Sequence, residues 1–344
     1  MKLYICGNGF DLHHGLKTSY DDYKKFLEKH HRDTLIDFEH YTKIGNTYDF
    51  CWSDIEKALE IDMSKLIEKC LIDYVDDPII QVHPENYNHM EDYDLDEEEV
   101  YRTDPLAREM TNLVSFIDNF TALHFMEWLC SIDLKHSKND PVLGIDPQDL
   151  YITFNYLDSL KQIYKIPADR ILHVHGSLEE LGSVEKVRRS CMKLQRNGPR
   201  VVETESEREE DLIKLMKNEI RGTLQFGAAR DFDQEFIRID NLYYNNLDVV
   251  GVLSVVDEAI QNSSKRITDN YDHILDFISS KDDIDTVIVM GHSLNAGDYP
   301  YYSEVLVKEL KEKEWVFYYH DETHSEEDKF VAKTGIKNYR LIRW

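Results

Sequence analysis

The sequence predicts an α/β fold with a mostly parallel β-sheet and helical insertions. Six short apolar runs are the first observation, since each is rich in β-branched or aromatic residues and has the length of a buried central strand. They cover residues 3–6, 151–154, 171–174, 223–226, 286–290 and 316–319. Stretches of helical periodicity between these runs are the second observation, and such alternation is typical of parallel sheets.

Two long amphipathic stretches predict helices between the first two strands. Apolar residues recur at spacings of three and four over residues 55–71, which places them on one helix face. Ser53 stands in the N-cap position of this helix, with Glu56 in the position of its capping-box partner. The same spacing recurs over residues 106–129.

The remaining charged stretches suggest how the chain is organised. Residues 76–99 contain two prolines and a long acidic run, which predicts a solvated loop. The charged block at residues 203–211 opens a further helix, continuing to about Ile220. We therefore expect one α/β domain over residues 1–344, with a helical insertion at about 21–148 and a smaller one at about 179–222.

Composition excludes several classes of protein. The 40 Lys and Arg residues against 67 Asp and Glu give a net charge of −27, which repels nucleic acids but is compatible with a small anion held by backbone amides. No apolar run approaches the roughly 18 residues of a membrane span, so no membrane is expected. The five scattered cysteines form no C-x-x-C pair, and the chain opens without a secretory signal, so we expect a cytoplasmic protein.

A glycine-rich turn follows the first predicted strand. Gly7 and Gly9 let the backbone approach a pyrophosphate, so Gly7, Asn8 and Gly9 are candidate nucleotide-binding residues. An ordinary strand-to-helix turn is the alternative, because Leu12 stands where the usual dinucleotide fingerprint has a third glycine. Asp11 is a candidate to orient a ribose or a water, or to cap the following helix.

Polar side chains also follow the second and third predicted strands. Asn155 is a candidate to hold a ribose hydroxyl or a water, with a helix N-cap as the alternative. His175 falls at a strand tip and is a candidate general base, whereas His173 is expected to pack within the sheet. A metal pair of these two histidines lacks further ligands nearby in the sequence, so no metal is predicted.

A third loop follows the strand at residues 286–290. Gly291-His292-Ser293 looks like the start of a nucleophile elbow, but Asn295 occupies the place of the second glycine of that motif. A serine hydrolase is therefore disfavoured. Gly291 and Ser293 are instead candidate nucleotide contacts, with an ordinary loop as the alternative.

The order and spacing of these motifs resemble the sirtuin catalytic domain. Residues 7–20 are similar to its Gly-Ala-Gly loop, and Asn155 matches the Asn of its Thr-Gln-Asn-Ile-Asp motif. His175 matches its catalytic His-Gly-Ser, and residues 291–294 match its later Gly-Thr-Ser-Leu loop. The resemblance implies a sirtuin-like, Rossmann-type sheet that binds NAD. Cys191 is the single cysteine where sirtuins have a four-cysteine zinc module, so no acyl-lysine platform and no deacylation are implied.

A closer resemblance is to the AbiH family of bacterial abortive-infection proteins. Residues 7–20 match its opening, which looks like Gly-Asn-Gly-Phe-Asp-Leu-x-x-Gly-Leu-x-Thr-x-Tyr. Residues 52–56, 154–156, 175–178 and 291–294 look like its later motifs, so the similarity covers nearly the whole chain. It implies a role in defence against bacteriophage.

Together the resemblances imply an effector that hydrolyses the nicotinamide glycosidic bond of NAD, its small-molecule nucleotide substrate. Gly7 and Gly9 would then admit the pyrophosphate, and Asn155 would hold the nicotinamide ribose or the attacking water. His175 would take a proton from that water or from a ribose hydroxyl. Glu56 either reaches the same pocket or serves as a capping-box residue.

Two other classes of function are kept as alternatives. One is a sensor that binds a nucleotide without chemistry, its helical insertion recognising a phage product or a partner protein. The other is a nuclease, which the net charge disfavours and for which the sequence shows no metal-carboxylate spacing. A lethal hydrolase must be held inactive until infection, so we expect control by homo-oligomer assembly or by a lid formed from the insertions.

Overall fold

The computed structural model describes most of the chain. The described residues are 1–45, 52, 55–75, 105–136, 144–197, 205–229, 232–243, 252–279, 284–294, 297–320 and 323–344.

Six parallel strands form one sheet in the order β3-β2-β1-β4-β5-β6. They are β1 (Lys2–Cys6), β2 (Leu150–Thr153), β3 (Ile171–His173), β4 (Thr286–Met290), β5 (Glu314–Tyr319) and β6 (Tyr339–Arg343). The central strand β1 aligns Leu3 with Leu150 of β2 and with Val287 of β4. The predicted α/β class with a parallel sheet is confirmed, and the strand order is that of Rossmann-like sheets, whose winding reverses between β1 and β4.

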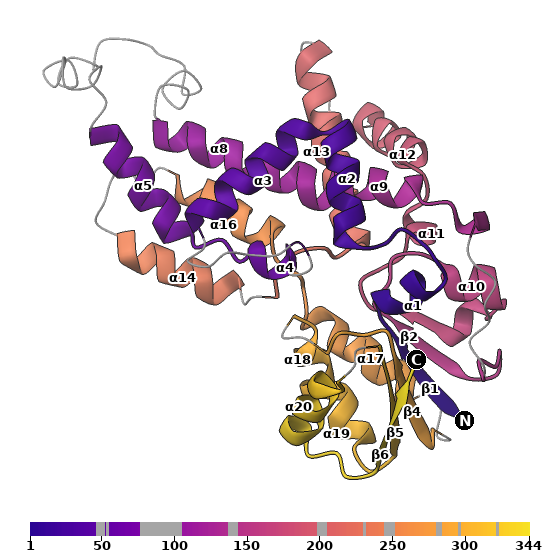
Figure 1. The fold of residues 1–344 in the computed structure, drawn as a ribbon. Helices are drawn as coiled ribbons and strands as arrows, with labels where there is room; N and C mark the ends of the chain where they lie inside the picture. The colour runs from indigo at the N-terminus through magenta and orange to yellow at the C-terminus, as the bar shows by residue number, and fades with distance from the viewer. Residues whose placement is uncertain are drawn as a thin grey trace, which may run out of the picture.

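Helices cover both faces of the sheet, as Figure 1 shows. One face carries α17 (Asp269–Ser279), α18 (Tyr299–Tyr301), the π-helical turn η6 (Tyr302–Leu306), α19 (Val307–Leu310) and α20 (Ser325–Thr334). The other face carries α1 (Asn8–His13) and α10 (Ser159–Tyr164). Side chains alternate along a strand, so those of β1 point to both faces of the sheet. Leu3 and Ile5 pack against the face that carries α17 to α20, and Tyr4 and Cys6 pack against the face that carries α1 and α10.

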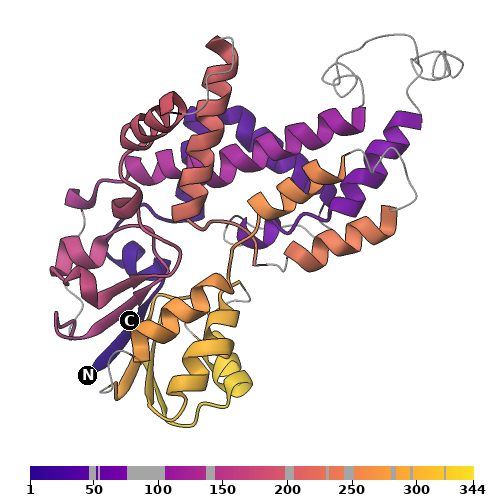
Figure 2. The ribbon, with the colours of Figure 1, turned by 180° about the vertical axis from the view of Figure 1, so that it is seen from behind.

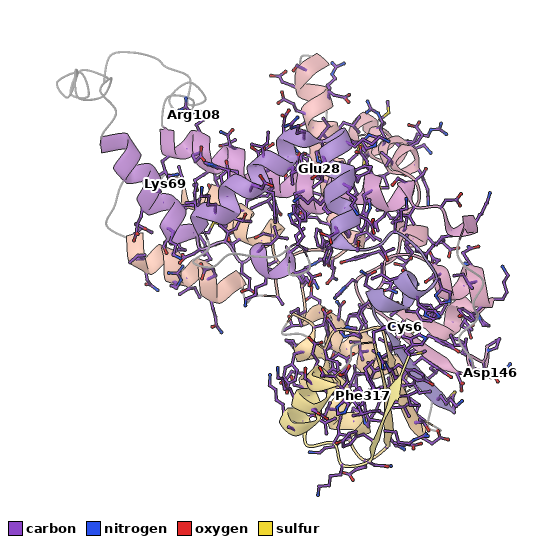
Figure 3. The ribbon with its side chains drawn as sticks, viewed as in Figure 1. Cys6, Glu28, Lys69, Arg108, Asp146 and Phe317 are labelled. Atoms are coloured by element: carbon purple, nitrogen blue, oxygen red, sulfur yellow. The ribbon has the colours of Figure 1, made fainter. Side chains whose placement is uncertain are left out.

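A separate helical layer lies beyond the carboxyl edge of the sheet, as the two opposite views agree (Figures 1 and 2). Its helices are α2 (Tyr20–His30), α3 (Arg32–Gly45), α4 (Ile55–Ala58), α5 (Met63–Val75), α8 (Pro105–Asp118), the π-helical turn η3 (Asn119–Leu123), α9 (His124–Ser131), α12 (Val184–Asn197), α13 (Glu205–Thr223), α14 (Phe232–Tyr243) and α16 (Leu253–Asn262). The short elements η4 (Leu134–His136) and α11 (Leu178–Leu181) lie on the connections between the layers, and η5 (Ala168–Arg170) lies between α10 and β3. Figure 3 places Glu28 and Lys69 in this layer and Cys6 and Phe317 in the sheet.

The helical layer has a hydrophobic core of its own, in which aromatic rings stack closely. Phe125 and Phe226 stack with ring centroids 4.1 Å apart, and Phe38 and Phe120 stack at 4.8 Å. Within the described ranges, no helix combines the length and the apolar character that crossing a bilayer would require.

The predicted strand at residues 223–226 is wrong. α13 continues to Thr223, and the residues after it form a connector (224–228) outside the sheet. Leu224 and Phe226 are buried in the helical layer, which accounts for their strand-like alternation. The backbone N–H of Gln225 donates to the carbonyl of His175 at 2.9 Å, so the connector runs along the residue that follows β3. The sixth strand is β6, whose two exposed arginines, Arg340 and Arg343, mark an edge rather than a buried run.

The helix predictions have mixed outcomes. Residues 106–129 are helical throughout, as predicted, with a π-helical turn between α8 and α9. The single helix predicted over residues 55–71 is two helices, α4 and α5, because Asp62 starts a new one by accepting a hydrogen bond from the backbone of Ser64 at 3.1 Å. The predicted helix opening near residue 203 is α13. The acidic loop at residues 76–99 and the N-cap Ser53 lie outside the described residues.

Candidate active site

The loops that follow β1, β2 and β4 meet at the reversal point of the sheet. Gly7 follows β1, Asn155 follows β2 and Gly291 follows β4, and these strands are neighbours. In open parallel sheets, ligands bind outside the carboxyl ends of the strands at such a point. Three of the loops chosen from the sequence are thus brought together here.

The glycines allow two loops to touch. The N–H of Gly7 donates to the carbonyl of Met290 at 3.0 Å, and the N–H of Gly9 donates to that of Gly291 at 2.8 Å. A Cβ on Gly9 would lie 2.7 Å from Gly291 Cα, and one on Gly291, whose φ is +61°, would lie 2.3 Å from the Phe10 nitrogen. Contact between the loops therefore requires glycine at these positions, which is a packing reason for the motif alongside the predicted phosphate contact.

Asn155 and Asp11 hold the first loop to the second. Asn155 Nδ2 donates to the Gly7 carbonyl at 3.0 Å, and Asp158, not Asn155, is the N-cap of α10. Asp11 lies buried inside α1 rather than at its cap, where it accepts a hydrogen bond from Ser159 Oγ. Burial raises the pKa of Asp11 to about 7, although hydrogen bonds from Ser159 and Asn155 act in the opposite direction. Asn155 is thus a positioning residue in this conformation.

Five side chains form a buried ion cluster beside these loops: Glu56, His175, Lys265, His292 and Asp298. Lys265 has an exposed side-chain fraction of 0%, and its Nζ lies 2.7 Å from Glu56 Oε2 and 3.2 Å from Asp298 Oδ1. His175 Nε2 lies 3.5 Å from Asp298 Oδ1, and His292 Nε2 lies 3.4 Å from Asp298 Oδ2. Buried charges are costly unless paired, so this cluster must be held by the fold around it.

The members of the ion cluster come from several parts of the chain. Glu56 comes from α4, where it also accepts a hydrogen bond from the Tyr20 hydroxyl at 2.7 Å. Lys265 follows α16 and pairs with connector 224–228, since its N–H donates to the carbonyl of Ala228 at 2.8 Å. The same connector runs along His175, so it brings Lys265 toward this histidine. His292 belongs to the loop after β4.

Hydrogen bonds select the tautomer of the His292 ring. Its Nδ1 accepts the backbone N–H of Leu294 at 3.2 Å, so the other nitrogen carries the proton and donates to Asp298. Leu294 adopts a left-handed backbone with φ of +50°. This conformation is uncommon for a side chain of that size.

The ion cluster shifts the pKa values of its members in opposite directions. Burial opposes the charged forms of Lys265 and Asp298, but their attraction holds the pKa of Lys265 above and that of Asp298 well below their ordinary values. Burial, and next the Lys265 ammonium, lower the pKa of His175 to about 3, so its imidazole is neutral at pH 7. With two carboxylates and one ammonium, the cluster carries an excess of one negative charge.

Aromatic side chains enclose the two histidines of the cluster. The ring of Phe154 contacts His292 at 4.4 Å and His175 at 5.3 Å between centroids, and Tyr301 lies 5.7 Å from His175. His175 Nε2 is buried and has no hydrogen-bond partner among the residues that the structure describes. An unpaired polar nitrogen in such a place is a common mark of a functional site.

The structure thus divides the residues selected from the sequence into three groups. Gly7, Gly9, Asp11, Asn155 and Gly291 meet where the loops touch, and His175 lies in the ion cluster together with Glu56. Asn8 instead donates through Nδ2 to the Thr18 carbonyl at 2.8 Å, and Ser293 is exposed.

Three members of the ion cluster were missed by sequence reasoning. His292 and Asp298 lie in the motif after β4, although neither was selected. Lys265 carries no local signal in the sequence, because its role depends on connector 224–228.

Two surface cavities in the described part of the chain lie away from the ion cluster. One, of about 470 Å³, is lined at the amino edge of the sheet by residues that include Lys2, Asp146 and Asp285. The other, of about 520 Å³, is lined in the helical layer by residues that include Lys25, Phe26 and Trp128. The side chains of the ion cluster are themselves between 0% and 18% exposed, so little solvent reaches them in this conformation.

One comparison with known proteins identifies a family. Residues 3–319 match the family model described as Bacteriophage abortive infection AbiH. No curated protein and no solved structure matches the chain.

Proposed function

Because the chain belongs to the AbiH family and is therefore a phage abortive-infection defence protein, we propose that it is an effector that hydrolyses the nicotinamide glycosidic bond of NAD. The observation that carries the proposal is the buried ion cluster beside the reversal point of a Rossmann-like sheet. The same edge of the sheet carries the motifs whose order resembles that of sirtuins.

The charge of the ion cluster suits this reaction. Nicotinamide leaves from a cationic ring, and the ribose develops the positive charge of an oxocarbenium ion as the bond breaks. Glu56 and Asp298 supply carboxylates that are already fixed by Lys265 and His292, so they need no reorganisation to stabilise this charge. The net negative charge of the ion cluster favours binding of the cationic nicotinamide ring of NAD over binding of the neutral nicotinamide that is released.

His175 is the proposed base. A water attacks C1′ of the nicotinamide ribose, the bond to the ring nitrogen breaks, and its electron pair stays with the departing neutral nicotinamide. The proton of the water passes to the unpartnered Nε2 of His175, and Asp298, 3.5 Å away, stabilises the imidazolium that forms. The products are nicotinamide, ADP-ribose and a proton.

The experiment compares wild-type protein with His175→Ala and with His324→Ala. His324 is a matched control, because it also pairs with an aspartate, Asp328, but lies 45% exposed and outside the cluster. Each protein is incubated with NAD, alone and in lysate of phage-infected cells, and nicotinamide and ADP-ribose are measured by chromatography. We expect release by wild type and His324→Ala and none by His175→Ala. Equal release by all three proteins would place the activity elsewhere.

A nucleotide sensor is the second candidate function, and the enclosure of the ion cluster favours it. A sensor needs a closed pocket that opens on a signal, and it needs no turnover. Binding of NAD or ADP-ribose measured by calorimetry, with no product formed even in infected lysate, would replace the glycohydrolase with this function.

A further inference from the structure

Two histidines and a glutamate converge in the helical layer, far from the ion cluster in sequence. His31 lies between α2 and α3, His124 is the first residue of α9, and Glu127 follows one turn later on the same face of α9. One ligand atom from each of the three lies within 4.8 Å of the others. All three side chains are partly buried, so a ligand held between them would remain accessible.

The contacts within this histidine-glutamate cluster (His31, His124 and Glu127) hold the three side chains against one another. The rings of His31 and His124 lie face to face, with centroids 3.6 Å apart and an interplanar angle of 13°. His31 Nε2 lies 2.7 Å from Glu127 Oε2. The buried Thr34 hydroxyl bonds Nδ1 of His124 at 3.1 Å, which leaves Nε2 of that ring for another partner. Metal-ligating histidines are held in this way by a hydrogen bond to the nitrogen that does not bind the metal.

A simple ion pair does not account for this arrangement. The pairing of His31 with Glu127 needs no second imidazole, yet the ring of His124 lies against His31 and is held there by the Thr34 hydroxyl.

We propose that His31, His124 and Glu127 form a zinc site with a water in the fourth position. Two histidines, a carboxylate and a water are an established zinc ligand set, and ligand atoms of tetrahedral zinc are roughly 3.3 Å apart. That spacing falls between the 2.7 Å of the closest pair and the 4.8 Å that bounds the group. A ring nitrogen binds a metal in the plane of its own ring, so one of the two stacked imidazoles turns about its side-chain bonds to complete the site.

The zinc site ties two separate parts of the helical layer together. It joins the α2–α3 junction to α9, and α2 begins with Tyr20, the donor to Glu56. Phe26 packs on His31 at 5.6 Å and lines the cavity of about 520 Å³ together with Trp128, the neighbour of Glu127. This cavity therefore lies next to the histidine-glutamate cluster. The proposal is independent of the reaction at the ion cluster.

Zinc content and zinc affinity test the proposal. Full-length protein is stripped with a chelator, titrated with Zn²⁺ alone by calorimetry, and analysed for bound metal. We expect one zinc per chain, a rise in melting temperature on binding, and the visible absorption of a tetrahedral site when Co²⁺ is used instead. His124→Ala and Glu127→Gln each remove a ligand and are expected to weaken binding by about 100-fold.

His40→Ala is the matched control. His40 also pairs with a glutamate of the helical layer, Glu109, at 3.6 Å, but it lies outside the cluster, so this variant is expected to bind zinc as the wild type does. If His124→Ala fails to fold, Glu127→Gln keeps the side-chain shape and decides the question. Wild-type protein that binds no zinc, or variants that bind it unchanged, would overturn the proposal.

Discussion

The ammonium of Lys265, fully buried, lies 2.7 Å from Oε2 of Glu56, although 209 positions separate the two residues. Glu56 belongs to the helical layer, and Asp298, the second partner of Lys265, is the N-cap of α18 on the sheet. Lys265 is therefore an electrostatic link between the two layers. If the spacing of the two layers changed, these buried charges would separate. Little solvent would be available to take the place of the lost partners.

Replacing this lysine is expected to destabilise the protein strongly. Lys265→Met leaves two buried carboxylates without their cation, which typically costs about 3–5 kcal/mol in the free energy of unfolding. Denaturant unfolding at pH 7 measures the loss. Lys308→Met is the control, because Lys308 pairs with Glu304 on an exposed helix face and should cost less than about 1 kcal/mol. Equal losses would show that the ion cluster contributes little to stability.

A pair of glycine variants tests the contact between the two loops. Gly291→Ala should destabilise by about 2–4 kcal/mol, since its backbone is left-handed and the new Cβ meets the Phe10 nitrogen. Gly222→Ala in α13, where a Cβ meets nothing within 4 Å, should instead stabilise by about 0.5–1 kcal/mol. Thermal unfolding followed by circular dichroism gives both values, and a neutral Gly291→Ala would refute the close contact.

Asp11 should make the protein less stable as pH rises. Its pKa is raised from 3.8 to about 7, so the folded state holds a proton that the unfolded state has lost between these values. The stabilisation is complete below about pH 4 and is lost up to about pH 7, at a slope of at most about 1.4 kcal/mol per pH unit. Asp11→Asn should remove this slope, while the exposed Asp169→Asn should keep it. Unfolding series across this range measure the difference.

His175 should make the protein less stable as pH falls. Its pKa is lowered from 6.5 to about 3, so between these pH values the unfolded state binds a proton that the folded state does not bind. Its contribution is complete above about pH 6.5 and is lost as pH falls toward 3. His175→Gln should flatten this acid-side loss, whereas His324→Gln should not. An unchanged acid-side slope in His175→Gln would mean that the imidazole is not held neutral.

The sequence predicted the sheet well because its strands are buried on both faces. The runs that became β1, β2, β4 and β5 have little alternative to a central position in a parallel sheet. The run at residues 223–226 looks the same, but the helical layer buries it, and an apolar pattern does not say which surface does the burying. Strand β6 was not predicted, because this edge strand carries exposed arginines and so lacks the apolar run of a buried strand.

The candidate site was predictable where its residues follow strands. His175 and Gly291 could be found because carboxyl ends of parallel strands meet at one edge. Lys265 and the histidine-glutamate cluster could not, since residues such as His31 and His124 become neighbours through packing between helices. The spacing of residues along the sequence does not predict such contacts.

The register of β1 has a consequence for synthesis. Its partners β2 and β4 begin at residues 150 and 286, so β1, the first strand synthesised, cannot pair on both sides until β4 has been synthesised. At ribosomal rates of about 5–20 residues per second, β1 waits roughly 15–60 s for β4. Nascent and truncated chains lack Asp298 and the loop after β4, so they cannot assemble the ion cluster. An activity that depends on the ion cluster therefore cannot begin before the residues up to Asp298 have been synthesised.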